Sequence, residues 1–218
     1  MRTRILGTLS RVNEAHPWSH NNAYAPFVLY QAWRARRDGA TTGLDVGCGT
    51  GDLLRRLARV LPEVTGLEPD SATAEKASAA TRDLDNATVV SGSFPTAESP
   101  RYDFVSMVAV LHHLPLDAGI RAAKESLNPG GRLVIVGCFE GPAAQWSEVL
   151  SLALNPLVGL LLHPRRATSV PECMTAPAAK ATDPFQRIRD ALVSSLPGVT
   201  IRHGLFWRYT AVWVAPKE

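Results

Sequence analysis

The chain has 218 residues, of which 45% are hydrophobic and 20% are charged, values that are typical of one globular domain and exclude a disordered chain. The formal net charge is +3. The arginines lie in scattered groups of two and three, which indicates solvated helix faces and argues against a nucleic-acid partner. The three cysteines include no Cys-x-x-Cys pair, so we expect reduced thiols in the cytoplasm rather than a disulfide framework.

Helix and strand patterns alternate along much of the chain. Parallel strands need crossover helices, so this alternation predicts a doubly wound α/β fold with a mostly parallel sheet. A strong turn, Asn-Pro-Gly-Gly at 128–131, is expected to close the last helix of this region. The expected helices are 24–37, 52–61, 71–82 and 116–127, and the expected strands are 42–46, 64–68, 88–90, 102–109 and 132–138.

The alternation breaks after residue 139. The apolar stretch 146–163 is interrupted by charged and helix-breaking residues, which argues against a membrane-spanning helix and favours a buried helix over the sheet. The same stretch is also compatible with an interfacial role or with contact to a lipid-like ligand. A helix over 185–196 and strands over 199–206 and 209–215 complete a seven-stranded sheet, although no Asn-Gly or Asp-Gly pair marks their hairpin.

We therefore expect a single domain over residues 1–218 with four parts. These parts are an N-terminal lid (1–38), a ligand-binding α/β core (42–138), an insertion that covers the ligand site (139–183) and a closing helix with two strands (184–218).

The segment LDVGCGTGD, residues 44–52, lies where the first strand ends and a helix begins. Glycines at such a junction allow a sharp turn and close approach of a ligand. The dinucleotide fingerprint is Gly-x-Gly-x-x-Gly, and Asp52 occupies the place of its third glycine. An acid at a helix start repels a pyrophosphate, so Asp45 and Asp52 favour a ligand with ammonium or sulfonium groups.

A second signal is Glu68, at the end of the second expected strand and 17 residues after Gly51. A carboxylate at this place accepts hydrogen bonds from both hydroxyls of a ribose.

With the motifs LDVGCGTG, GLEPD, SGSF, YDFVSMVAVLHHL and LNPGGRLVIV in this order, residues 42–138 resemble the class I S-adenosylmethionine-dependent methyltransferases. LHHL and LNPGG resemble the quinone and natural-product branches. The resemblance implies S-adenosyl-L-methionine as cofactor, S-adenosyl-L-homocysteine as product, and in-line methyl transfer to a small acceptor. The apolar composition of residues 146–163 suggests that this acceptor is apolar or aromatic.

The resemblance also implies roles for individual residues. Glu68 holds the ribose hydroxyls, Asp45 lies near the ammonium group, and Ser93 takes the place of the acid that usually meets the adenine. The other implied cofactor-binding residues are Gly47, Cys48, Gly49, Gly51, Pro69, Gly92, Phe94 and Ala109.

His112 and His113 follow the fourth strand, where the family places methyl transfer. Because they are adjacent, we expect at most one to face the ligand, as a general base. The chain has neither the Pro-Pro motif of base methyltransferases nor the carboxylate cluster of metal-dependent enzymes, so we expect no nucleic-acid substrate and no metal.

In similar methyltransferases the segment before the first strand folds over the cofactor. Its residues Trp18, Asn21, Asn22 and Tyr24 are candidates for cofactor contacts. The candidates for acceptor contacts are His20, Trp146 and Leu150.

Two alternatives remain at this stage. One is a non-catalytic subunit that binds the cofactor and supports a partner enzyme. The other is an NAD-dependent oxidoreductase, against which the glycine spacing argues. The acceptor, the methylated atom and the oligomeric state are left open.

Overall fold

The computed structural model describes residues 16, 18–95, 100–141, 145–162 and 181–217. Its centre is a seven-stranded sheet of order β3-β2-β1-β4-β5-β7-β6, in which β7 runs antiparallel to its neighbours. The predicted doubly wound, mostly parallel fold is confirmed. The strands are β1 (Thr42–Val46), β2 (Glu63–Glu68), β3 (Ala87–Ser91), β4 (Tyr102–Val108), β5 (Leu127–Cys138), β6 (Thr200–His203) and β7 (Arg208–Val214).

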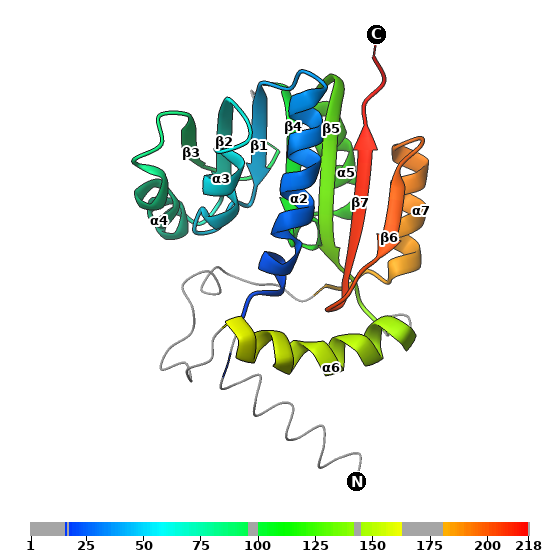
Figure 1. Cartoon of the computed structure of the whole chain (residues 1–218). Coiled ribbons are helices and arrows are strands. Elements are labelled where there is room, and N and C mark those ends of the chain that lie inside the picture. The colour runs from blue at the N-terminus through cyan, green and yellow to red at the C-terminus, as the bar shows by residue number, and fades with distance from the viewer. Residues whose placement is uncertain (1–15, 17, 96–99, 142–144, 163–180, 218) are drawn as a thin grey trace.

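Helices cover both faces of the sheet (Figure 1). In β5, Val134 and Val136 face the cluster under α2 and α3, whereas Leu133 and Ile135 face the cluster under α5 and α7. This alternation buries the central strands on both sides. The helices are α2 (His20–Arg37), α3 (Asp52–Leu57), α4 (Ser71–Thr81), α5 (Leu116–Glu125), α6 (Gln145–Leu162) and α7 (Phe185–Ser195), with a 3₁₀ turn η1 (Leu111–His113).

Two elements differ from their predicted bounds in ways that matter. Helix α2 begins at His20 rather than at residue 24, because tertiary contacts stabilise a first turn whose residues have weak helix propensity. The predicted turn at 128–131 lies within β5 instead. The pairs Tyr102↔Leu127 and Phe104↔Arg132 show that this tetrapeptide bulges out of the ladder without ending the strand.

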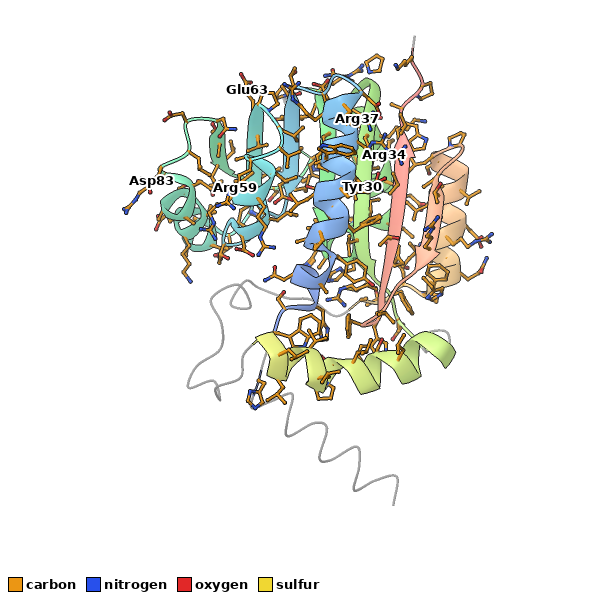
Figure 2. All side chains as sticks on the ribbon, viewed as in Figure 1. Tyr30, Arg34, Arg37, Arg59, Glu63 and Asp83 are labelled. Carbon is orange, nitrogen blue, oxygen red and sulfur yellow. The ribbon has the colours of Figure 1, made fainter. Side chains whose placement is uncertain are left out.

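The basic side chains of α2 lie on its solvent side. Tyr30, Arg34 and Arg37 are exposed along the outer face of the helix, and Arg59 is exposed after α3 (Figure 2). For these residues the interpretation as solvated helix faces is confirmed.

Helix α6 lies across the end of the sheet at which the parallel strands finish (Figure 1). No helix within the described ranges has the length and apolar character needed to cross a membrane.

Candidate active site

A cavity of about 980 Å³ opens at the carboxyl ends of the parallel strands. Strand β1 pairs with β2 on one side and with β4 on the other, so the winding direction of the chain reverses there, which is where ligands bind in open α/β sheets. Of the predicted site residues, the cavity is lined by Trp18, His20, Asn21, Asn22, Asp45, Gly47, Cys48, Gly49, Glu68, Pro69, Gly92, Ser93, Phe94, Ala109, His112 and His113.

The glycine loop forms the floor of the cavity. Gly47 and Gly49 have φ of +64° and +56°, in the left-handed region that favours glycine. A Cβ at Gly47 would lie 2.5 Å from Val110 Cγ2. The Gly47 and Cys48 N–H groups both donate to the Leu67 carbonyl, at 2.7 and 3.1 Å, which ties the loop to β2.

Gly51 serves packing rather than the cavity, in contrast to its predicted cofactor contact. It precedes α3 with φ +84° and is not among the lining residues. A Cβ at this position would lie 3.2 Å from Ala77 Cα, so the glycine allows α3 to approach α4 closely.

Glu68 is fixed by the backbone of two neighbouring loops. Its side chain is 6% exposed. The Gly49 N–H donates to Oε2 at 3.0 Å, and the Asp70 N–H donates to Oε1 at 3.2 Å. Each oxygen of an ionised carboxylate has a second lone pair. The carboxylate is therefore oriented at the cavity wall and can accept two further hydrogen bonds.

Asp45, at the end of β1, is almost fully buried. The Ser106 hydroxyl donates to its Oδ1 at 2.7 Å, whereas its Oδ2 has no hydrogen-bond partner among the described residues. Burial raises the pKa of Asp45 to about 7, against the effect of the Ser106 hydrogen bond, and the nearby Glu68 carboxylate adds to the rise. A buried acceptor without a partner needs an explanation, and a ligand N–H or cation in this cavity supplies one.

The end of β4 brings both histidines to the cavity. Ala109 has φ +56°, and its N–H donates to Val136 at 2.7 Å. His112 and His113 then follow in η1, with ring centroids 4.3 Å apart. Both histidines line the cavity, whereas we expect at most one of them to face the ligand. Which imidazole contacts the ligand stays a prediction.

A roof, formed by Trp18, His20 and Asn155, joins the N-terminal segment to α6. The Trp18 Nε1–H donates to Asn155 Oδ1 at 2.9 Å, and His20 Nε2 lies 3.0 Å from the same oxygen. An amide oxygen only accepts, so His20 carries its proton on Nε2. Burial and the Arg208 charge lower the pKa of His20, opposed by the Asn155 hydrogen bond.

The turn between β6 and β7 supports this roof from outside. The Phe206 ring packs edge-on against Trp18 at 4.9 Å and stacks on His20 at 5.2 Å. Phe206 and Trp207 both have positive φ, as in type I′ hairpin turns, where Asn-Gly is preferred. The Phe206 N–H donates to the buried Ser151 hydroxyl of α6 at 2.7 Å, which helps to hold this strained turn.

Comparisons with known proteins agree with this geometry. A family model described as a methyltransferase domain matches residues 18–157. The chain belongs to this methyltransferase family. It is 32% identical over 192 residues to uncharacterized methyltransferases of Mycobacterium tuberculosis and Mycobacterium bovis, which covers 82% of this chain and 89% of theirs. The resemblance to class I S-adenosylmethionine-dependent methyltransferases is thereby confirmed.

Two more distant matches are also named as methyltransferases. A ubiquinone biosynthesis O-methyltransferase of Alkalilimnicola ehrlichii is 29% identical over 112 residues, covering 49% of this chain and 45% of that protein. The solved structure of the N-methyltransferase NodS from Bradyrhizobium japonicum has a TM-score of 0.56 at 14% identity, covering 90% of this chain and 98% of that one. That likeness shows the fold alone.

Besides Gly51, two predicted contacts of this methyltransferase, Tyr24 and Leu150, do not line the cavity. The Tyr24 hydroxyl donates to the Leu205 carbonyl at 2.8 Å, so it braces the turn after β6. Leu150 is 42% exposed, because α6 turns Ser151 and Asn155, one helical turn apart, toward the interior. The Trp146 side chain lies outside the described residues.

Asn155 and Arg208 are among the lining residues that the sequence reasoning did not single out. Asn155 interrupts an apolar stretch, which is a weak signal of a buried polar role. Arg208 begins β7 opposite Cys138 of β5, and only the tertiary pairing reveals that it reaches the cavity.

The cavity thiols are poor nucleophile candidates. Burial raises the pKa of both Cys48 and Cys138, and for Cys138 the Arg208 charge opposes this effect. Within the described ranges, no group of three or more His, Cys, Asp or Glu side chains could hold a metal ion.

Proposed function

We propose that this methyltransferase uses S-adenosyl-L-methionine to methylate a small acceptor in the same cavity, with S-adenosyl-L-homocysteine as product. One observation carries the proposal. Two buried carboxylates, Asp45 and Glu68, end adjacent strands beside a glycine loop that is hydrogen-bonded to Glu68. Dinucleotide sites also place an acid near a glycine loop, but the methyltransferase family match speaks against the oxidoreductase alternative.

The residues present fit this cofactor at two points. Glu68 keeps free lone pairs on both oxygens for the two ribose hydroxyls, because each oxygen accepts one N–H from the chain. The unpartnered Oδ2 of Asp45 suits an ammonium group or a water bound to one. Ser93 and Phe94 line the same cavity near the end of β3, and we assign them to the adenine.

When bound, S-adenosyl-L-methionine supplies a methyl group on a positively charged sulfur, which is already a good leaving group. The chain's contribution is therefore mainly alignment and exclusion of water. The roof residues close the cavity toward α6. His112 and His113 lie at the end of β4, where either imidazole can take a proton from an acceptor hydroxyl or amine.

The walls near β4 support a partly apolar acceptor. Val108, Val110 and Leu114 line the cavity beside the histidines. One relative is named as an O-methyltransferase of ubiquinone biosynthesis, which supports a small-molecule acceptor for this chain as well.

Calorimetry tests the cofactor assignment. We expect S-adenosyl-L-homocysteine to bind the purified protein with micromolar affinity and NADH not to bind. Absence of S-adenosyl-L-homocysteine binding would contradict the proposal. Release of S-adenosyl-L-homocysteine from S-adenosyl-L-methionine in the presence of an acceptor library would separate the enzyme from the non-catalytic alternative.

A further inference from the structure

The charged side chains of the cavity are divided between its two sides. The acids Asp45, Asp52, Glu68 and Asp70 come from the ends of β1 and β2 and the loops that follow them. On the opposite side, Arg208 is the one Lys or Arg among the described lining residues. The cavity therefore has a negative end and a positive end.

Arg208 is held in place by neutral groups. Its Nε and Nη2 donate to Asn21 Oδ1 at 3.4 and 3.2 Å, and its Nη1 donates to the Phe206 carbonyl at 3.3 Å. None of the ion pairs found between described residues includes it. A guanidinium has five N–H donors, so two remain, on a cation that is fixed and has no counter-charge from the described chain.

The sheet order places Arg208 away from the proposed cofactor side. The cofactor residues end β1, β2 and β3, whereas β7 lies two strands beyond β4 in the other direction. Arg208 pairs with Cys138 at the carboxyl end of β5. The histidines that follow β4 thus lie between the acids and the arginine along the sheet.

We infer that the acceptor of this methyltransferase carries an anionic oxygen, a carboxylate or an ionised phenol, that pairs with Arg208. A partly buried guanidinium with neutral partners is costly unless a ligand supplies the charge, and planar guanidinium groups favour carboxylates. The inference rests on the proposed function, because it names the substrate class of that same site.

Alkylation of Cys138 tests this inference without a known acceptor. It lines the cavity beside Arg208, and iodoacetate and iodoacetamide are similar in size but differ in charge. The rate of alkylation at Cys138 is measured by peptide mass spectrometry for both reagents, on protein saturated with S-adenosyl-L-homocysteine. The reaction is run at alkaline pH, because burial raises the pKa of this thiol. Arg208 also affects the pKa of the Cys138 thiol, but this effect is the same for both reagents and therefore cancels in the ratio of the two rates.

We expect Arg208→Gln to lower the iodoacetate-to-iodoacetamide ratio roughly threefold or more. Arg202→Gln is the matched control, because Arg202 is exposed on the neighbouring strand β6, and it should leave the ratio unchanged. An unchanged ratio in Arg208→Gln would overturn the inference. So would a loss of S-adenosyl-L-homocysteine affinity in that variant, which would assign Arg208 to the cofactor.

Protection of Cys138 from iodoacetamide distinguishes the two kinds of anion. We compare 1-naphthoate with 1-naphthamide, and 4-nitrophenol above and below its own pKa. Stronger protection by one anion than by its neutral form, lost in Arg208→Gln, identifies the carboxylate or the phenol. Equal protection by every anion and its neutral form counts against the inference. Failure of the proposed function shows separately, as absence of S-adenosyl-L-homocysteine binding to the wild-type protein.

Discussion

Replacing Glu68 with glutamine changes the charge of the proposed ribose site with little change in shape. The carboxylate accepts one N–H from Gly49 and one from Asp70. Glutamine has a single acceptor oxygen, so one of these N–H groups would face an NH₂ group. Hydrogen bonds to a charged group are worth about 1.5–3 kcal/mol. We therefore expect Glu68→Gln to bind S-adenosyl-L-homocysteine about 1–3 kcal/mol more weakly than the wild type, roughly 5- to 150-fold in Kd. Glu68→Ala should bind this ligand no more tightly than Glu68→Gln.

Calorimetry on the wild type and the Glu68 variants measures the loss. Glu63→Gln is the control, since it makes the same change at the other, exposed end of β2 (Figure 2), and its affinity should match that of the wild type. Urea unfolding of each variant separates weaker binding from weaker folding. Wild-type affinity in a folded Glu68→Gln, or an equal loss in Glu63→Gln, would refute the placement of the ribose at Glu68.

Four further predictions address the buried acid, the floor of the cavity and the support of the roof. Binding of S-adenosyl-L-homocysteine near pH 6.5 should release up to about one proton, because burial raises the Asp45 pKa to about 7 and an ammonium group beside Asp45 favours its ionised form. This proton release should be absent in Asp45→Asn. Calorimetry in buffers of different ionisation enthalpy measures the release, and equal release in both proteins would contradict the prediction. Since the Asp45 pKa is raised from 3.8, its ionisation should lower the free energy of unfolding of the free protein as the pH rises from about 4 through about 7, which urea unfolding against pH measures with Asp45→Asn as reference. Gly47→Ala should reduce S-adenosyl-L-homocysteine binding at least about tenfold, because the new Cβ would meet Val110 at a φ that favours glycine; unchanged binding would mean that the loop relaxes without cost. Ser151→Ala should lower the free energy of unfolding by about 1–3 kcal/mol, because the buried Phe206 N–H loses its acceptor, and an effect below about 0.5 kcal/mol would show that this N–H finds another partner.

The sheet, the glycine loop and the acid that follows it can be predicted from the sequence. The strands and crossover helices are visible because their apolar periods of two and 3.6 are local properties. The loop at 44–52 and Glu68 come from consecutive βα units, and consecutive parallel strands usually become neighbours in the sheet. Short-range order along the chain was therefore enough to bring the main predicted cofactor residues together.

The other half of the cavity depends on contacts between distant parts of the chain. Trp18 meets Asn155 across 137 positions, and Asn21 meets Arg208 across 187. No local pattern links residues so far apart, and each has an ordinary role when considered alone. The turn at Phe206 is also invisible in the sequence, because its positive φ depends on support from α6 rather than on the glycine that such turns usually contain. Periodicity and turn chemistry act over a few residues, whereas the roof and the charge at β7 depend on contacts that exist only once the sheet has formed.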